Sequence, residues 1–316
     1  MSEAIRVGVE NFARAETDRM FNEIAAAAGG TNRWRHNREP SPLNEQTVIR
    51  QNRDTLYSFA IVDISAGATL TIPDSAGRYI SVMIVNQDHY INRVLHSAGD
   101  FALTVDEFDT PWVMVAARIL VDPGDPADLD TVNALQDQLA LTVNQPRDFH
   151  SPSYEAQSFG EVRTALLDLN RHMHGFSHAF GTRSAVDPVK HLIGTASGWG
   201  GLPDTEASYE SVEPGLPVGD YEITVRDVPV DAFWSISVYN KDGFFEQNDR
   251  EMYIVNSVTA VKNDDDSTTI RFGSRDAPNT IPIMDGWNYT VRLYRPRAEI
   301  LNGTWTFPSL AAAEQH

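Results

Sequence analysis

The sequence predicts a mainly β protein with helical additions, in which short strands form antiparallel sheets. Two sets of β-branched and aromatic segments, between residues 56 and 121 and between residues 221 and 294, alternate with turn signals rich in Gly, Pro, Asp and Ser. Several strands at such spacing are typical of an antiparallel sandwich or barrel. Segments with helical periodicity precede the first set and separate it from the second. We therefore expect two sheet domains with helices at the start of the chain and between the sheets.

The first element is a predicted helix that begins after Ser2 and ends at Gly29. Apolar residues from Ile5 to Ile24 recur at helical spacing, and Ser is a residue type that caps helix N-termini. The polar, Pro-containing stretch 31–51 is expected to form an extended loop. The first set of predicted strands follows, with the bounds Leu56–Ile64, Ala68–Ile72, Arg78–Asn86, Phe101–Val105 and Trp112–Val121.

The middle of the chain is predicted to be helical. Three helices are expected, with the bounds Leu129–Leu141, Glu155–Phe180 and Asp187–Ser197. The glycine-rich stretch 194–201 marks the predicted boundary between a domain of residues 1–200 and a domain of residues 201–316. After a loop over residues 203–219, the second set of predicted strands is Tyr221–Val225, Phe233–Tyr239, Met252–Val255, Thr268–Phe272 and Trp287–Tyr294.

Composition restricts the possible partners. The 316 residues carry a formal net charge of -19, so the surface would repel nucleic acid and anionic membranes, and neither is expected as a partner. No window approaches the length of apolar sequence that a membrane span needs, and residues 1–10 do not resemble a secretory signal. We therefore expect a cytoplasmic protein. The absence of Cys excludes disulfides, thiolate metal sites and a cysteine nucleophile.

A first cluster of candidate site residues lies where the chain enters the strand that begins at Leu56. Asn52, Arg53 and Asp54 bring an amide, a guanidinium and a carboxylate together, and Tyr57 follows within the strand. In the functional interpretation Asp54 is an acid or base and the other three residues contact substrate. The alternative is that these side chains only bond the backbone of their own turn, as Asn and Asp often do.

A second cluster, Asp88, His89 and Tyr90, follows the strand that ends at Asn86. An acid, an imidazole and a phenol in succession can orient a ligand and move protons near neutral pH. As a general base His89 would need an orienting carboxylate, for which Asp54 and Asp88 are the candidates. The alternative is a buried His that bonds the backbone.

Metal and cofactor sites are not predicted. His174 and His178 are four residues apart and would share one face of the predicted helix, which is the geometry of two zinc ligands, but no spacing specifies a third ligand. An exposed helical face is therefore the favoured interpretation. The glycine-rich stretch 194–201 matches neither a dinucleotide-binding nor a phosphate-loop pattern, and Ser197 is not in a G-x-S-x-G motif. We expect no organic cofactor.

The last predicted strand, which begins at Trp287, has one face that should be core. Trp287 and Tyr289 alternate with residues of the opposite face, where Arg292 and Tyr294 lie. Together with Tyr239 of the earlier aromatic strand, these two residues are candidates for a concave pocket in which Arg292 binds an anionic group. The competing interpretation pairs Arg292 with a nearby acid and uses the aromatic rings to close the sheet.

Long motifs in both halves of the chain resemble one bacterial family. They comprise Asn52–Ser58, Asn86–Tyr90, the stretch from Asp187–His191 to Gly200-Gly201, Ala232–Asn240 and Gly286–Arg297. They are similar to proteins that pair domain of unknown function 1254 with domain of unknown function 1214. The resemblance covers nearly the whole chain, and it implies two antiparallel, jelly-roll-like β-sandwiches. It implies no agreed biochemical role.

Two functions follow from these residues. The first is an enzyme of the hydrolase or lyase type that acts on a small organic molecule without an organic cofactor. Asp54, Asp88 and His89 would supply the acid/base groups, and Arg292 would bind an anionic group. The second is a non-catalytic β-sandwich that binds a sugar or another small organic ligand. A small molecule is the expected partner in both cases, and a homo-oligomer remains open.

Overall fold

The structure is a computed structural model that describes residues 4–46 and 49–313. The chain folds into two compact units, and neither is continuous in sequence. The N-terminal unit contains the residues up to 38 together with 56–120 and 130–204. The C-terminal unit contains residues 39–55 and 121–129 as well as the chain from residue 205 onward. The turn that carries Asp54 therefore belongs to the C-terminal unit, although it lies early in the sequence.

The N-terminal unit contains two sheets. A five-stranded sheet has the strand order β1-β2-β7-β4-β5, and a three-stranded sheet has the order β6-β3-β8. Their bounds are β1 Arg35–His36, β2 Thr55–Asp63, β3 Ala68–Ile72, β4 Ile80–Asn86, β5 Ile91–Leu95, β6 Gly99–Leu103, β7 Trp112–Leu120 and β8 Ala140–Val143. Every residue of β4 and of β7 is buried, which explains their nearly unbroken apolar sequences.

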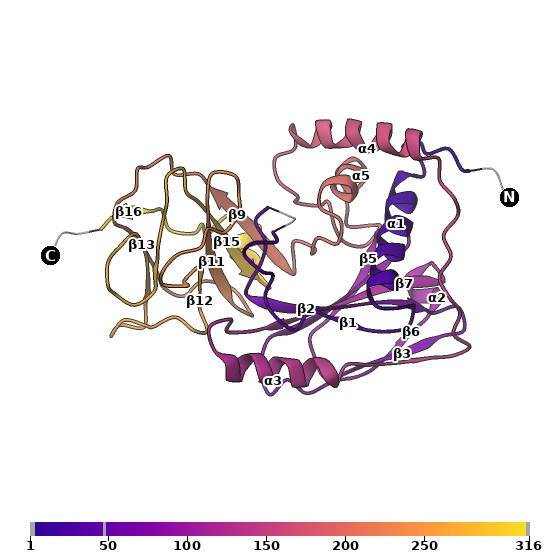
Figure 1. Cartoon of the computed structure of the whole chain (residues 1–316), viewed down its shortest axis with the longest axis horizontal. Helices are drawn as coiled ribbons and strands as arrows, with labels where there is room; N and C mark the ends of the chain where they lie inside the picture. Colours follow the sequence, from indigo (N-terminus) through magenta and orange to yellow (C-terminus); the bar gives the residue numbers. More distant parts are fainter. Residues whose placement is uncertain (1–3, 47–48, 314–316) are drawn as a thin grey trace. The chain divides into compact units, whose positions relative to one another are not determined.

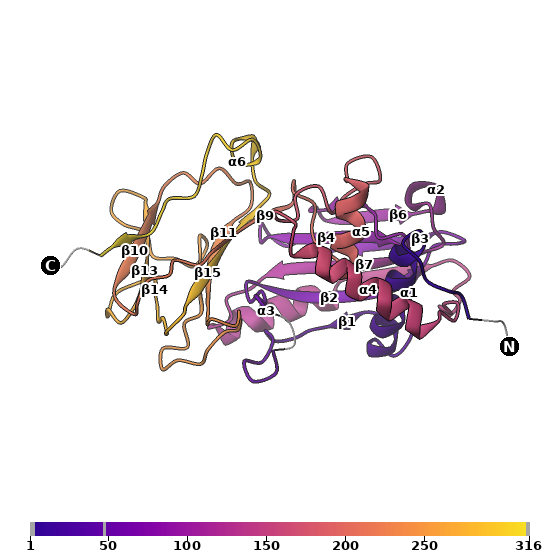
Figure 2. The same ribbon diagram turned by 90° about the horizontal axis from the view of Figure 1, so that it is seen from above.

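Helices cover the five-stranded sheet. The helices are α1 Phe12–Ala27, α2 Val105–Phe108, α3 Pro126–Asp137, α4 Ala156–Asn170 and α5 Pro188–Ser197. Helices α1, α4 and α5 lie over one face of this sheet, and the three-stranded sheet lies beyond the other (Figures 1 and 2). Side chains of the three covering helices form one apolar cluster that includes Phe12, Leu166 and Ile193.

The first helix is shorter than predicted. It begins at Phe12, and Asn11 is its N-cap residue, whereas Ser2 lies outside the described residues. The preceding segment pairs with residues far along the chain, since the Ile5 N–H bonds the Ser153 carbonyl over 2.8 Å and the Glu155 N–H bonds the Ile5 carbonyl over 2.8 Å. Tertiary hydrogen bonds therefore replace helical ones in this segment.

The predicted helix Glu155–Phe180 is also too long. Helix α4 ends at Asn170, and two of the residues that follow, Gly175 and His178, have φ of 74° and 61°. Such left-handed backbone is incompatible with a continuing helix. By contrast, α5 has nearly the predicted bounds, and the Asp187 side chain caps it by accepting hydrogen bonds from the backbone N–H groups of Val189 and Lys190.

The C-terminal unit contains two four-stranded sheets, with the orders β14-β13-β10-β16 and β12-β11-β15-β9. The bounds are β9 Ala207–Val212, β10 Tyr221–Val225, β11 Trp234–Tyr239, β12 Ile254–Asn256, β13 Thr268–Phe272, β14 Thr280–Ile281, β15 Asn288–Tyr294 and β16 Ala311–Ala312, with the short helix α6 at Ala298–Leu301. One apolar core takes side chains from both sheets, among them Ile270 of β13 and Val291 of β15.

The two faces of β15 are both buried. Trp287, which precedes the strand, and Tyr289 belong to the apolar core, as the sequence predicted. Arg292 and Tyr294 lie on the opposite face but are only 3% and 1% exposed. The chain before β2 covers this face, because backbone carbonyl groups of residues 50 and 51 bond the Arg292 side chain.

The predicted fold class is confirmed at a coarse level. The chain is a strand-rich mixed α/β protein with four sheets in which antiparallel pairs dominate. A jelly-roll topology stays a prediction of the family resemblance. No helix in the described part of the chain is long and apolar enough to cross a membrane.

Candidate functional site

The motif Asn86–Tyr90 forms a tight turn at the end of β4. The Asn86 Oδ1 atom accepts hydrogen bonds from the backbone N–H groups of Asp88, at 3.0 Å, and Tyr90, at 2.9 Å. His89 has φ of 64°, so the strand has ended and its alternation no longer separates neighbouring side chains. Asp88 and His89 nevertheless have different surroundings.

His89 is fully buried, and both of its ring nitrogens are used. The Nε2 atom accepts a hydrogen bond from the Gly200 N–H over 2.9 Å, which places the ring proton on Nδ1. Nδ1 lies 2.8 Å from the Thr195 Oγ1 atom, which in turn donates to the His191 carbonyl. Burial, assisted by the nearby His191, holds the pKa of His89 well below its usual value. His89 is therefore a neutral imidazole with one fixed tautomer.

Aromatic rings surround this imidazole. The Trp199 ring stacks on it with centroids 5.4 Å apart, and Phe180 meets it edge-on at 5.8 Å. A Cβ atom on Gly201 would lie 2.3 Å from the Phe180 ring, so the close approach of this loop requires glycine. The glycine-rich stretch thus packs around His89 inside the N-terminal unit.

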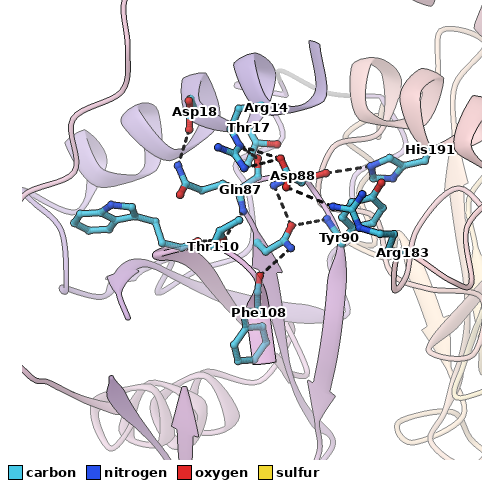
Figure 3. Close-up of polar contacts among 12 residues, drawn as sticks. Arg14, Thr17, Asp18, Gln87, Asp88, Tyr90, Phe108, Thr110, Arg183 and His191 are labelled. Carbon is cyan, nitrogen blue, oxygen red and sulfur yellow. Dashed lines mark hydrogen bonds and ion pairs between the residues drawn. The ribbon is translucent and has the colours of Figure 1, made fainter. Parts of the chain in front are cut away.

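Asp88 is a partly exposed ion-paired carboxylate. Arg14 on α1 lies 2.7 Å from its Oδ1 atom, and Arg183 lies 3.7 Å from its Oδ2 atom (Figure 3). The Arg183 guanidinium also lies 4.4 Å from the centroid of the Tyr90 ring, which stacks on His191 at 4.5 Å. The Asp88 side chain therefore pairs with arginines, and no bond joins it to the His89 ring among the described residues.

A buried carboxyl that the sequence did not single out supports the same turn. Gln87 donates to the Asp18 Oδ1 atom over 3.0 Å, and the Tyr154 hydroxyl donates to Oδ2 over 2.7 Å. Burial raises the pKa of Asp18, and these two hydrogen bonds oppose the shift. Asp18 connects α1 to the turn (Figure 3). Its helical position among buried neighbours gave no sequence signal for this role.

Asp54 lies in a different environment, in the C-terminal unit. Its carboxyl group is fully buried, and the Ser235 hydroxyl of β11 donates to Oδ2 over 2.5 Å. Its Oδ1 atom has no hydrogen-bond partner within the described part of the chain. Burial raises the pKa of Asp54, and the charge of Arg292 and the polar side chains of Ser235 and Asn256 oppose this shift. Asp54 is thus a predicted catalytic residue whose pKa lies above its usual value, with a buried guanidinium nearby.

Arg292 is buried among hydroxyl and carbonyl oxygens. It donates to the Ser237 hydroxyl over 2.7 Å and to the Tyr239 hydroxyl over 2.6 Å. It also donates to the carbonyl groups of Arg50 and Gln51 over 2.8 and 3.1 Å. Although burial acts to lower it, the neighbouring Tyr239, Tyr294 and Asp54 raise the pKa of Arg292. The guanidinium ties residues 50 and 51 to the sheet, and its role in binding an anion stays a prediction.

The contacts of Asn52 and Arg53 resemble the structural alternative given for these residues, in which their side chains bond the nearby chain and no substrate. Asn52 Oδ1 accepts from the Asp54 backbone N–H over 2.8 Å, and its amide donates to the Tyr294 hydroxyl over 2.9 Å. The Arg53 guanidinium lies 5.6 Å from the centroid of the Tyr253 ring and donates to a backbone carbonyl. Both side chains hold the turn against the C-terminal sheet.

The structure therefore divides the predicted site residues between the two units. Asn52, Arg53, Asp54, Tyr239, Arg292 and Tyr294 belong to the C-terminal unit, and Tyr57, Asp88, His89 and Tyr90 belong to the N-terminal unit. Tyr57 stacks on Phe59 at 5.7 Å and lies beneath the Arg118 guanidinium at 5.4 Å. A mechanism that joins Asp54 to His89 stays a prediction.

The prediction that His174 and His178 share one exposed face of a helix is wrong. Both residues follow the end of α4, and the left-handed φ of His178 removes any common helical face. The described residues contain no group of three or more His, Cys, Asp and Glu side chains that could hold a metal ion.

Sequence reasoning missed a pocket at the edge of the C-terminal core. We call it the edge pocket. It is formed by Glu210 and Val212 of β9, Tyr289 and Val291 of β15, Pro214, Leu216 and residues 307–310, and its volume is about 280 Å³. Strand β9 lay within the predicted loop 203–219, because its sequence ASYESV has few large apolar residues. Its alternation of small, apolar and polar residues is the weak signal that was available.

Comparison with known proteins matches two regions of the chain to family models. Residues 31–104 match the family described as Protein of unknown function (DUF1254), and residues 214–298 match Protein of unknown function (DUF1214). The chain pairs a DUF1254 region with a DUF1214 region. The turn with Asp54 and the turn with His89 both lie in the DUF1254 region, and Tyr289 and Arg292 lie in the DUF1214 region. The curated proteins gave no match.

Two solved structures resemble this DUF1254/DUF1214 chain. The VPA0106 protein of Vibrio parahaemolyticus is 18% identical, with a TM-score of 0.75 over 97% of this chain and 98% of the other. An uncharacterised protein from Burkholderia cenocepacia is 14% identical, with a TM-score of 0.51 over 90% of this chain and 84% of the other. At such identities the likeness establishes the fold alone.

Proposed function

We propose that this protein binds a small organic molecule with both apolar and polar groups in the edge pocket. The observation that carries the proposal is the cavity itself, of about 280 Å³, with the rings of Tyr289 and Phe307 in its lining. Ligand sites in proteins are concave, with mostly apolar walls and a few polar groups. The edge pocket contains both kinds of group, since Val212 and Val291 line it and Glu210 supplies a carboxyl group, and its lining is more polar than that of a typical ligand site.

The walls of the edge pocket are held by contacts of their own. The Trp287 indole N–H donates to the Leu216 carbonyl over 3.2 Å, which fixes the loop that follows β9. On the other side the Phe307 ring meets the Trp234 ring edge-on at 6.2 Å, and Phe307 is only 7% exposed. Walls that are ordered before a ligand arrives reduce the entropy lost on binding.

The contacts of the predicted catalytic residues favour binding over chemistry. Both nitrogens of the buried His89 are hydrogen-bonded, so the ring would have to break a bond before it accepted a proton. The Asp88 carboxylate is paired with Arg14. A general base must reach the proton that it abstracts, and neither group is free to do so while these bonds persist.

The test is a screen of small organic molecules that detects binding by changes in the NMR spectrum of the full chain. We expect binders whose signals are lost in Ser309→Trp, because residue 309 lines the edge pocket and the indole would fill it. Thr306→Trp is the matched control, because Thr306 is exposed on the same segment and does not line the pocket. Binding that survives Ser309→Trp unchanged would place the ligand elsewhere and overturn the proposal.

Acid/base chemistry is the second candidate function, and Asp54 supports it. A buried carboxyl with one unpartnered oxygen and a raised pKa is the state that a general acid requires. The reaction would be of the hydrolase or lyase type. Broad hydrolase and lyase assays with Asp54→Asn and His89→Ala test it, and activity that is unchanged in both variants would exclude these two residues from the mechanism.

Three finer expectations accompany the proposal. We infer a jelly-roll-like sandwich for the C-terminal unit, which the shared core of its two sheets supports. A cytoplasmic location and a homo-oligomeric state stay predictions. Light scattering of the full chain measures the oligomeric state directly.

A further inference from the structure

The edge pocket contains one charged side chain, that of Glu210, at an exposed position of β9. In the register of the two strands Glu210 is directly opposite Val291, and Val212 is opposite Tyr289. Directly opposite residues of an antiparallel pair share one face of the sheet. Glu210 therefore lies on the face whose other residues, Tyr289 and Val291, belong to the apolar core.

No basic side chain lines the edge pocket to balance this carboxylate. Of the lining residues, all of which lie in the described part of the chain, Glu210 alone carries a charge. Burial raises the pKa of Glu210 above its usual value, which is the electrostatic effect of an unpaired carboxylate near apolar surface. A positively charged group stabilises an unpaired carboxylate of this kind, and a cationic ligand would supply that group.

The aromatic walls suit the same kind of ligand. The Tyr289 side chain is 3% exposed, and burial together with Glu210 raises its pKa to about 12, so its hydroxyl stays neutral. A neutral phenol can accept a hydrogen bond from a charged donor. Phe307 also lines the pocket, and like Tyr289 it is largely buried in the apolar core.

We propose that the edge pocket selects a small organic cation, namely a protonated amine on an apolar body, with the Glu210 carboxylate as its counter-ion. This inference rests on the proposed function and adds the class of ligand. The apolar body contacts Val212 and Val291, and the ammonium group bonds Glu210. An anionic ligand of the same shape is excluded, because it would bring a second negative charge beside Glu210 in a chain whose net charge is already -19.

Benzylamine, benzyl alcohol and benzoate test the selection, because they share one ring and differ in charge. Titration calorimetry with the full chain at pH 7 and low salt measures each affinity. We expect benzylamine to bind about tenfold more tightly than benzyl alcohol, the effect of one charge-assisted hydrogen bond, and benzoate not to bind.

Glu210→Gln should weaken benzylamine binding about tenfold and leave benzyl alcohol binding within about twofold. Glu213→Gln is the control, since it removes a neighbouring exposed charge that does not line the pocket, and it should change neither affinity. A urea midpoint for each variant shows that the fold is intact.

The outcomes separate the two proposals. If benzylamine and benzyl alcohol bind equally, or if Glu210→Gln changes neither, the cation selection is wrong although the edge pocket still binds ligand. If benzoate binds most tightly, the assigned charge is wrong. If none of the three probes binds and the NMR screen also gives no ligand that Ser309→Trp displaces, both proposals fail.

Discussion

The backbone N–H of Gly200 donates to the Nε2 atom of His89 over 2.9 Å and so fixes which nitrogen of the imidazole carries the proton. This bond joins the glycine-rich loop after α5 to the turn after β4. Because the other nitrogen faces Thr195, the ring has no free polar atom. The motif that contains His89 and the glycine-rich stretch that contains Gly200 are thus parts of one buried contact.

His89→Ala should destabilise the protein. The substitution leaves the Gly200 N–H without its acceptor and removes an aromatic ring that stacks on Trp199. We expect the free energy of unfolding to fall by about 2–4 kcal/mol, measured by urea denaturation. His150→Ala, at an exposed position, is the matched control and should have little effect. Equal midpoints for the two variants would contradict the structural role of His89.

Stability should depend on pH through the same residue. Burial, with a smaller effect of His191, holds the folded-state pKa of His89 well below 6.5, so the unfolded chain binds the proton more readily. The contribution of His89 to stability is therefore complete above pH 6.5 and is lost as the pH falls below that value. Urea midpoints between pH 7.5 and pH 5 measure the loss, and His89→Gln should reduce its slope. An unchanged slope in that variant would assign the pH dependence to other groups.

Asp54→Asn should stabilise the folded state at neutral pH. Because burial raises the pKa of Asp54, its contribution to stability is present below the usual value of 3.8 and is lost as the pH rises through the folded-state pKa. A neutral amide avoids that loss and retains an oxygen that can accept from Ser235. We expect a gain of about 1 kcal/mol at pH 7 that shrinks toward pH 4, measured by urea denaturation. A variant less stable than the parent at pH 7 would show that the ionised carboxylate is needed.

Arg292→Lys should destabilise the C-terminal unit although it keeps the charge. A lysine ammonium cannot reproduce the planar fork that bonds Ser237, Tyr239 and two backbone carbonyl groups. We expect a loss of about 2–4 kcal/mol in the free energy of unfolding. Arg226→Lys is the control, because Arg226 forms an exposed ion pair with Asp265. If both substitutions have the same small effect, the buried network does not stabilise the fold.

The sequence predicted elements well where local signals agree. The strands Tyr221–Val225 and Thr268–Phe272 have the predicted bounds, and Asp187 caps α5 as its position before Pro188 indicates. Strand β9 was missed because its alternation of residue types is only a weak local signal, and its pairing with β15 joins residues far apart in the sequence. Tertiary pairing also explains the non-helical segment before Phe12.

The roles of the site residues were harder to predict than the fold, because these roles depend on contacts between residues that are far apart in the sequence. The motif around His89 showed an imidazole next to an acid, but no spacing indicated that Thr195 and Gly200 would occupy both ring nitrogens. Arg292 likewise showed a guanidinium on a mixed strand face, and only the fold reveals that the chain near residue 50 buries it. The competing structural interpretations could not be decided from spacing alone.

The discontinuous C-terminal unit has a consequence for the order of events during synthesis. Arg292 bonds the carbonyl group of Arg50, which lies 242 residues earlier in the chain. During synthesis this bond can form only after residue 292 has been made, when nearly the whole protein has left the ribosome. Until then the side chains of the segment around residue 50 stay solvated. Contacts of such high sequence separation form late and slowly. The N-terminal unit is complete in sequence by residue 204, so it can fold first. Residues 39–55 can pack against the strands of the C-terminal unit only later, when those strands have been made.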